Sequence, residues 1–242
     1  MRTSTRTLTV VACALVLAGC TSGGDGGGTA APTDDPTPTT TGPDPAPTTP
    51  APTGGAGAAP ADLAPEVLLP ATAWDLPVDP REESAGVVDW RLPQACDAGA
   101  PESATAMRTV VQGDGQAEAQ VGVQQVALFA DADAAVAEAD RLAAALRECT
   151  TYASDTATTY VVEPVEIGAQ GTGIATDYYG ASATGSLDEA IGSYLVTTRR
   201  GTAITLVGVE GGEALVSSAR GTATEQAQSA WALLCGYDSS GC

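Results

Sequence analysis

The chain has 242 residues and is strongly acidic, with 30 aspartates and glutamates against ten arginines and a formal net charge of −20. It contains no lysine and no histidine. It therefore lacks the base of Ser-His and Cys-His nucleophiles, the amine of Ser-Lys pairs and Schiff bases, and the histidine ligands of catalytic zinc. An acidic surface also repels nucleic acid, which we exclude as an expected partner.

The N-terminal segment has the pattern of a secretory leader. Arg2 and Arg6 precede an apolar run over residues 8–17 that is too short to span a bilayer. The run closes on Leu-Ala-Gly-Cys at 17–20, which resembles the lipobox of bacterial lipoproteins. We therefore expect residues 1–19 to be a lipoprotein signal peptide and Cys20 to carry acyl chains such as palmitate, anchoring the protein in the cell membrane on its extracytoplasmic face. The alternative is an ordinary secretory signal with an incidental cysteine, and Cys13 is a weaker candidate because only about half of the apolar run precedes it.

A low-complexity segment follows the lipobox. From residue 21 to residue 60 there is no Val, Ile, Leu, Met or aromatic side chain. We therefore expect residues 20–60 to be the lipidated cysteine and a disordered Thr/Pro/Gly-rich tether. A flexible coil of this length spans roughly 35 Å. Residues 61–242 are of the usual size for one domain with a full core.

The first half of this domain predicts an irregular stretch, a hairpin and a helix. Residues 65–101 are proline-rich and irregular, with anchors at Leu68, Leu69, Trp74 and Trp90. Strand-like runs follow at 105–112 and 119–129, separated by the hairpin signal Gly-Asp-Gly. Asp131 can cap the helix after them, whose apolar residues recur at steps of three and four: Ala135, Ala139, Leu142, Leu146 and Cys149.

The second half predicts four strands and a final helix. The strands lie near 158–167, 174–180, 191–198 and 202–209, with a glycine loop at 168–173 and a turn through Arg199-Arg200-Gly201. The helix runs from about 222 to 235 and places Ala227, Ala230, Trp231 and Leu234 on one face. The order of elements predicts an α+β fold, with an antiparallel sheet and two main helices packed on one face.

The cysteine count fits an extracytoplasmic domain. Four cysteines remain beyond the lipobox, which implies two disulfides with three possible connectivities. Cys235 and Cys242 are joined by a short flexible segment that closes easily, which leaves Cys96 to pair with Cys149. No C-x-x-C spacing indicates a redox role.

No motif predicts a reaction, a metal or a cofactor. The Gly-Ala-Ser-Ala-Thr-Gly run at 180–185 has the wrong spacing for a nucleophile elbow, and no Asp-Thr/Ser-Gly pattern of an aspartic protease is complete. No calcium loop is present. We therefore expect no enzyme activity, no catalytic residues, no metal and no cofactor. The one chemistry that the composition leaves open is a pair of carboxylates.

One stretch resembles a known family. Residues 126–135, leading into an alanine-rich helix that ends at Cys149, resemble the central segment of the extracellular sensor domains of PknH-type actinobacterial Ser/Thr kinases and their free-standing lipoprotein relatives. Trp90 and Cys96 upstream, the Arg200-Gly201 turn and a terminal helix ending at Cys235 also match. The resemblance spans about residues 63–242. It implies a small α+β domain with two disulfides and a cleft for an unidentified ligand, here without a kinase domain.

Three functional hypotheses follow. The first is a lipid-anchored, non-catalytic sensor-like domain that binds a small ligand or an envelope protein. Its candidate pocket aromatics are Trp74, Trp90, Tyr178 and Tyr179, although ordinary core packing also explains each of them. The second is a structural or interaction protein of the cell envelope. The third is a hydrolase that uses a pair of carboxylates.

Overall fold

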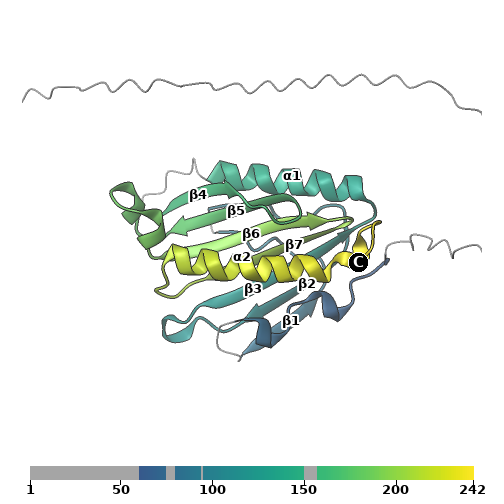
Figure 1. Ribbon diagram of the computed structural model, residues 1–242, viewed down its shortest axis with the longest axis horizontal. Coiled ribbons are helices and arrows are strands. Elements are labelled where there is room, and N and C mark those ends of the chain that lie inside the picture. The colour runs from purple at the N-terminus through teal and green to yellow at the C-terminus, as the bar shows by residue number, and fades with distance from the viewer. Residues whose placement is uncertain (1–59, 75–79, 94, 150–156) are drawn as a thin grey trace, which may run out of the picture. The chain divides into compact units, whose positions relative to one another are not determined.

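The computed structural model describes residues 60–74, 80–93, 95–149 and 157–242. The signal peptide, Cys20 and nearly all of the tether lie outside these residues. Seven strands form one antiparallel sheet in the order β1-β2-β3-β7-β6-β5-β4 (Figure 1). Their bounds are β1 Arg81–Ala85, β2 Ala104–Gln112, β3 Val121–Phe129, β4 Thr159–Pro164, β5 Ala169–Asp177, β6 Gly192–Arg200 and β7 Ala203–Glu210.

Two long helices accompany the sheet. Helix α1 spans Ala132–Cys149 and α2 spans Val216–Leu233. The described connections contain six short 3-10 helices, at Pro65–Val67, Ala71–Ala73, Gln116–Glu118, Ala181–Ala183, Leu187–Glu189 and Cys235–Tyr237. The predicted α+β class, the antiparallel sheet and the two main helices are confirmed. Asp131 caps α1 as expected, because its Oδ1 accepts a hydrogen bond from the backbone N–H of Ala134 at 2.8 Å.

The two helices pack on opposite faces of the sheet, not on one face as we expected. Helix α1 shares a core with Leu195 of β6 and Leu206 of β7. Helix α2 shares another core with Val196 and Val207, their neighbours along the same strands, and crosses β6 and β7 in front of the sheet in Figure 1. Successive side chains of a strand point to opposite faces. All residues of β3, and all of β7 except the last, are buried, so other parts of the chain must pack against both faces of these strands.

Three elements, β1, β5 and α2, differ most from the sequence-based expectation. Strand β1 lies inside the stretch expected to be irregular. It carries mostly charged, exposed residues at the edge of the sheet, so backbone pairing with β2 defines it rather than an apolar pattern. Strand β5 begins at Ala169, within the expected glycine loop, because Gly173 allows close packing: a Cβ there would lie 2.1 Å from the hydroxyl oxygen of Tyr194. Helix α2 begins at Val216, six residues early, since its first six residues include two serines and a glycine, which are weak helix formers.

Both predicted disulfides are confirmed. Cys96 pairs with Cys149 at the end of α1, and Cys235 pairs with Cys242 after α2. The first bond belongs to the core shared with α1, since both of its cysteines are buried.

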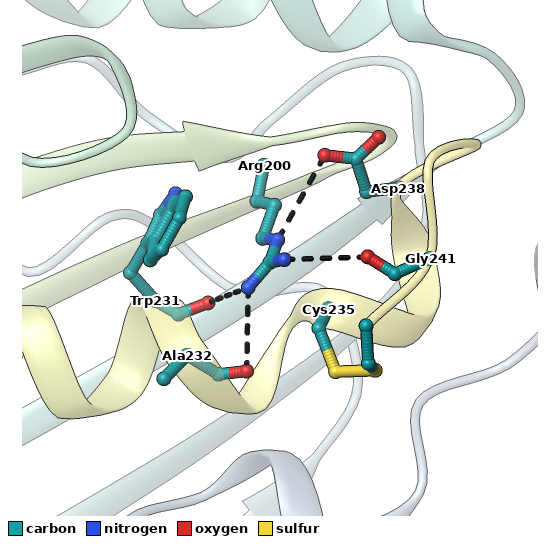
Figure 2. The surroundings of a disulfide bond; sticks show 7 residues. Arg200, Trp231, Ala232, Cys235, Asp238 and Gly241 are labelled. Carbon is teal, nitrogen blue, oxygen red and sulfur yellow. Dashed lines mark hydrogen bonds and ion pairs between the residues drawn. A yellow bond between two sulfur atoms is a disulfide. The ribbon is translucent and has the colours of Figure 1, made fainter.

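The tail beyond α2 is tied to the fold by an arginine as well as by its disulfide (Figure 2). Arg200 of β6 donates hydrogen bonds to the carbonyl oxygens of Trp231 at 3.3 Å, Ala232 at 3.4 Å and Gly241 at 3.4 Å. Its guanidinium also lies 4.2 Å from the centroid of the Trp231 ring. A cation at the C-terminal end of a helix stabilises the free carbonyl groups there.

The core continues beyond Leu234, the last residue on the apolar face predicted for the final helix. Tyr237 is also buried, at 5% exposure. Its hydroxyl donates to the carbonyl oxygen of Asp62 at 3.0 Å, and its own carbonyl oxygen accepts from the backbone N–H of Thr202. The tail therefore joins the first described residues to the turn between β6 and β7.

Candidate functional site

A cleft of about 430 Å³ opens at the end of the sheet where β5 and β7 finish and β4 and β6 begin. Side chains an even number of residues apart on a strand point to the same face of a sheet. Thr176, Ser193 and Glu210 of the cleft are separated in this way from Ile174, Leu195 and Leu206, respectively, which pack in the core under α1. The cleft therefore lies on the same face of the sheet as α1. Its floor is a row of directly paired residues: Tyr160 of β4 opposes Thr176 of β5, which opposes Ser193 of β6.

The floor contains a buried hydroxyl group for which the described residues supply no hydrogen-bond partner. Thr176 is 4% exposed, and its Oγ1 is unpartnered. Such a group costs free energy unless a ligand or water satisfies it. Two larger hollows, of about 630 and 760 Å³, lie beside α1 and along α2. Neither is lined by an unpartnered buried polar group among the described residues. This difference selects the cleft over Thr176 as the candidate site.

One ion pair lies among the described residues that line the cleft. The Nε and Nη2 atoms of Arg91 each lie 3.0 Å from Oε2 of Glu210. Burial raises the pKa of Glu210 above its ordinary value, although Arg91 partly opposes this shift. A glycosidase-type site needs two carboxylates about 5 to 9 Å apart. Glu210 is the one carboxylate among the described residues that line this cleft.

The position of Arg91 is fixed by neighbours in the core. Its backbone N–H donates to Oε1 of Gln125 at 2.7 Å, and the amide of Gln125 donates to the carbonyl oxygen of Asp89 at 3.1 Å. Between them, Trp90 is 5% exposed and donates from Nε1 to Oε1 of Glu138 on α1 at 2.7 Å. Trp90 thus anchors the segment that brings Arg91 to the rim.

The structure places the four predicted pocket aromatics in different surroundings. Tyr178 lines the cleft. Tyr179 is 65% exposed, and its ring lies edge-on to that of Tyr178 with centroids 6.5 Å apart. Trp74 is buried on the α2 face, where it packs against Gly122, and Trp90 is buried on the α1 face. A ligand-binding role for each of the four stays a prediction.

Sequence reasoning did not find Arg91, Thr176, Ser193 or Glu210. None lies in a recognisable motif, and they come from four separate segments of the chain. The sequence offered one weak indication of the site: Thr176 and Ser193 are polar, although the alternation of side chains along their strands places them on a face that packs in a core.

The turn that carries Tyr178 and Tyr179 is organised by a buried carboxylate. Asp177 is 0% exposed and accepts hydrogen bonds from the backbone N–H of Tyr179 at 3.1 Å and from the N–H and hydroxyl of Ser182 at 2.8 and 2.6 Å. Burial acts to raise the pKa of Asp177. The hydrogen bonds from Ser182, Tyr179 and Ala181 outweigh it, so the pKa lies below its ordinary value of 3.8.

We expect Asp177→Asn to destabilise the fold by about 2 kcal/mol at pH 7. The three donors bind both carboxylate oxygens of Asp177, whereas the amide of asparagine has one acceptor oxygen. The folded-state pKa of Asp177 is lowered, so its contribution is complete above pH 3.8 and is lost as the pH falls through the folded value. Urea unfolding should show that the wild type and the variant differ in free energy of unfolding at pH 7, and that this difference becomes smaller below pH 3.8. A difference that stays constant down to pH 2 would contradict this role.

A second polar cluster lies on the α2 face. The hydroxyl of Tyr194 donates to Glu163, whose Oε1 is 2.9 Å from Nε of Arg220, and Arg220 also pairs with Asp188. Burial, followed by the hydrogen bond to Glu163, raises the pKa of Tyr194. These contacts join β4, β6 and α2, so the cluster has a structural role.

Among the described residues, no group of three or more His, Cys, Asp or Glu side chains is arranged to hold a metal ion. No helix in the described part of the chain has the length and apolar content needed to cross a membrane.

The chain was compared with protein families, curated protein sequences and solved structures. No protein-family model and no curated protein sequence matches the chain. Among solved structures, the fold is similar to the extracellular domain of PknH from Mycobacterium tuberculosis, at 12% sequence identity and a TM-score of 0.42. The match covers 62% of this chain and 84% of that one.

Proposed function

We propose that this protein is a lipid-anchored, non-catalytic domain that binds a small ligand outside the cell membrane, in the cleft over Thr176. The observation that carries the proposal is the buried, unpartnered hydroxyl of Thr176 on the floor of a 430 Å³ hollow. Ligand sites are usually hollows of about 300 to 1,000 Å³ with mostly apolar walls and a few convergent polar groups. Leu92, Pro93 and Leu195 supply apolar wall here, while Arg91 and Glu210 supply polar groups.

Native mass spectrometry of the full chain, purified from its own host, tests ligand binding. We expect a retained mass that is released on unfolding. Ser193→Phe, which adds a ring to the floor of the cleft, should abolish it, whereas Ser218→Phe on the exposed surface of α2 should not. A mass retained equally by both variants would place the ligand elsewhere, and no mass in any sample would count against a small ligand.

The anchoring part of the proposal rests on the lipobox at residues 17–20. We expect Cys20→Ser to release the protein from the membrane fraction or to leave its leader uncleaved, because two acyl chains hold a protein on a bilayer far more durably than an acidic surface does. Cell fractionation and intact mass of the processed chain measure both outcomes. Cys13→Ser is the matched control and should be anchored like the wild type. A Cys20→Ser protein that is processed and still membrane-bound would refute the anchor.

A further inference from the structure

The charges at the cleft cancel one another. Arg91 and Glu210 are the two charged side chains among the described lining residues, and they pair through two contacts of 3.0 Å to one carboxylate oxygen. Because Arg91 and Glu210 already compensate each other, neither offers a free counter-charge to a ligand with a net charge. The excess of 30 acidic residues over ten arginines also repels anions. These features favour a neutral ligand.

The remaining polar groups of the cleft are hydroxyls. The described residues supply no partner for Oγ1 of Thr176, and Ser193 lies beside it on the paired strand. The hydroxyl oxygen of Tyr178 accepts from the backbone N–H of Gly211 at 2.9 Å, which leaves its proton to be donated. A hydroxyl group both donates and accepts hydrogen bonds. A ligand that is itself rich in hydroxyls can satisfy all three groups at once, whereas a carbonyl can only accept and an ammonium can only donate.

Flat aromatic surface lies next to these hydroxyls. Tyr178 and Tyr160 line the cleft. Tyr179 is outside the described lining, but its ring stands edge-on to that of Tyr178 and 65% of its surface is exposed. Aromatic side chains contribute large apolar contact areas while keeping a polar group available. The C–H face of a sugar ring is a matching apolar surface, bordered by hydroxyls.

We infer that the cleft binds a neutral, multiply hydroxylated ligand of one or two sugar rings, with its hydroxyls on Thr176, Ser193 and Tyr178 and a ring face on Tyr179. A volume of about 430 Å³ accommodates a disaccharide. This inference rests on the proposed function, because it names the class of ligand for the same cleft.

The test is a titration of the full chain with neutral disaccharides (maltose, cellobiose and trehalose) and with the charged sugars glucuronate and glucosamine, followed by calorimetry and saturation-transfer NMR. We expect binding of at least one neutral disaccharide and none of the charged sugars. Thr176→Val and Tyr179→Ala should each weaken that binding about fivefold, the range expected for one hydrogen bond or one aromatic contact. The matched controls are Thr159→Val on the exposed side of β4 and Leu215→Ala, another exposed apolar residue, and both should bind as the wild type does.

Failure of this inference can be told apart from failure of the proposed function. Binding of the charged sugars alone, or of no neutral disaccharide, overturns the ligand class. A mass that the host-derived protein retains and Ser193→Phe loses would then still support a ligand in the cleft. Equal weakening by the control variants would also overturn the inference, because it would show that the effects do not arise at Thr176 and Tyr179.

Discussion

Replacing Cys96 and Cys149 together by alanine is expected to lower the free energy of unfolding by about 4 kcal/mol, the chain-entropy value for a loop of this length. For a domain of this size the loss corresponds to a fall in Tm of roughly 12 °C. The physical reason is that the bond closes a separation of 53 residues, and it fixes the segment carrying Trp90 and Arg91 to the end of α1.

The double replacement of Cys235 and Cys242 is the matched control. This disulfide joins cysteines only 7 residues apart, so the same chain-entropy relation gives a loss of about 2.5 kcal/mol in the free energy of unfolding. Arg200 and Tyr237 hold the tail by separate contacts, which should keep the loss at or below that value. Urea unfolding of both variants measures the two costs. A larger loss for the tail bond would show that the end of α2 depends on its disulfide more than on Arg200.

Gly192→Ala is expected to destabilise the protein by about 3 kcal/mol and to disturb the floor of the cleft. A Cβ at this position would lie 1.8 Å from the carbonyl oxygen of Thr176, a backbone atom that cannot move without separating β5 from β6. Overpacking of a well-packed interior typically costs 1 to 3 kcal/mol, and contact with backbone falls at the upper end.

Gly208→Ala is the control for this substitution. Gly208 lies in β7, and its nearest contact for an added Cβ would be a side-chain carbon of Leu195 at 3.7 Å, an ordinary van der Waals distance. We expect it to change the stability by less than about 1 kcal/mol. Chemical denaturation compares the two, and amide NMR shifts at Thr176 and Ser193 report on the floor. Equal stabilities for the two variants would contradict the close packing of β5 on β6 at the cleft.

The sequence predicted most elements because their patterns are local. The apolar residues of α1 recur with helical spacing, Asp131 caps it, and the Gly-rich turns separate clear strands. Strand β1 was missed because an exposed edge strand of charged residues has no apolar alternation. The opposite placement of the two helices depends on burial of both sheet faces, which follows from long-range packing rather than from either helix.

Less of the candidate site was accessible to sequence reasoning. Tyr178 was proposed from its aromatic character, and the cleft does include it. The ion pair of Arg91 with Glu210 joins residues 119 positions apart, and the row of Thr176 and Ser193 exists only through strand register. Neither arrangement leaves a pattern in nearby sequence. Trp74 and Trp90 were also proposed from their aromatic character, but both are buried in cores. A domain with one phenylalanine needs its other large aromatic residues there.

The most direct test of a ligand in this cleft is the map of amide NMR shift changes when a small-molecule extract of the host's cell envelope is added to the full chain. The account predicts changes concentrated at Tyr160, Thr176, Ser193 and Glu210, with Arg220 and Ser229 on the α2 face unaffected. The same extract should produce no such changes in Ser193→Phe. Changes centred on the α2 face, or an unaltered pattern in Ser193→Phe, would contradict the assignment of the cleft as the binding site.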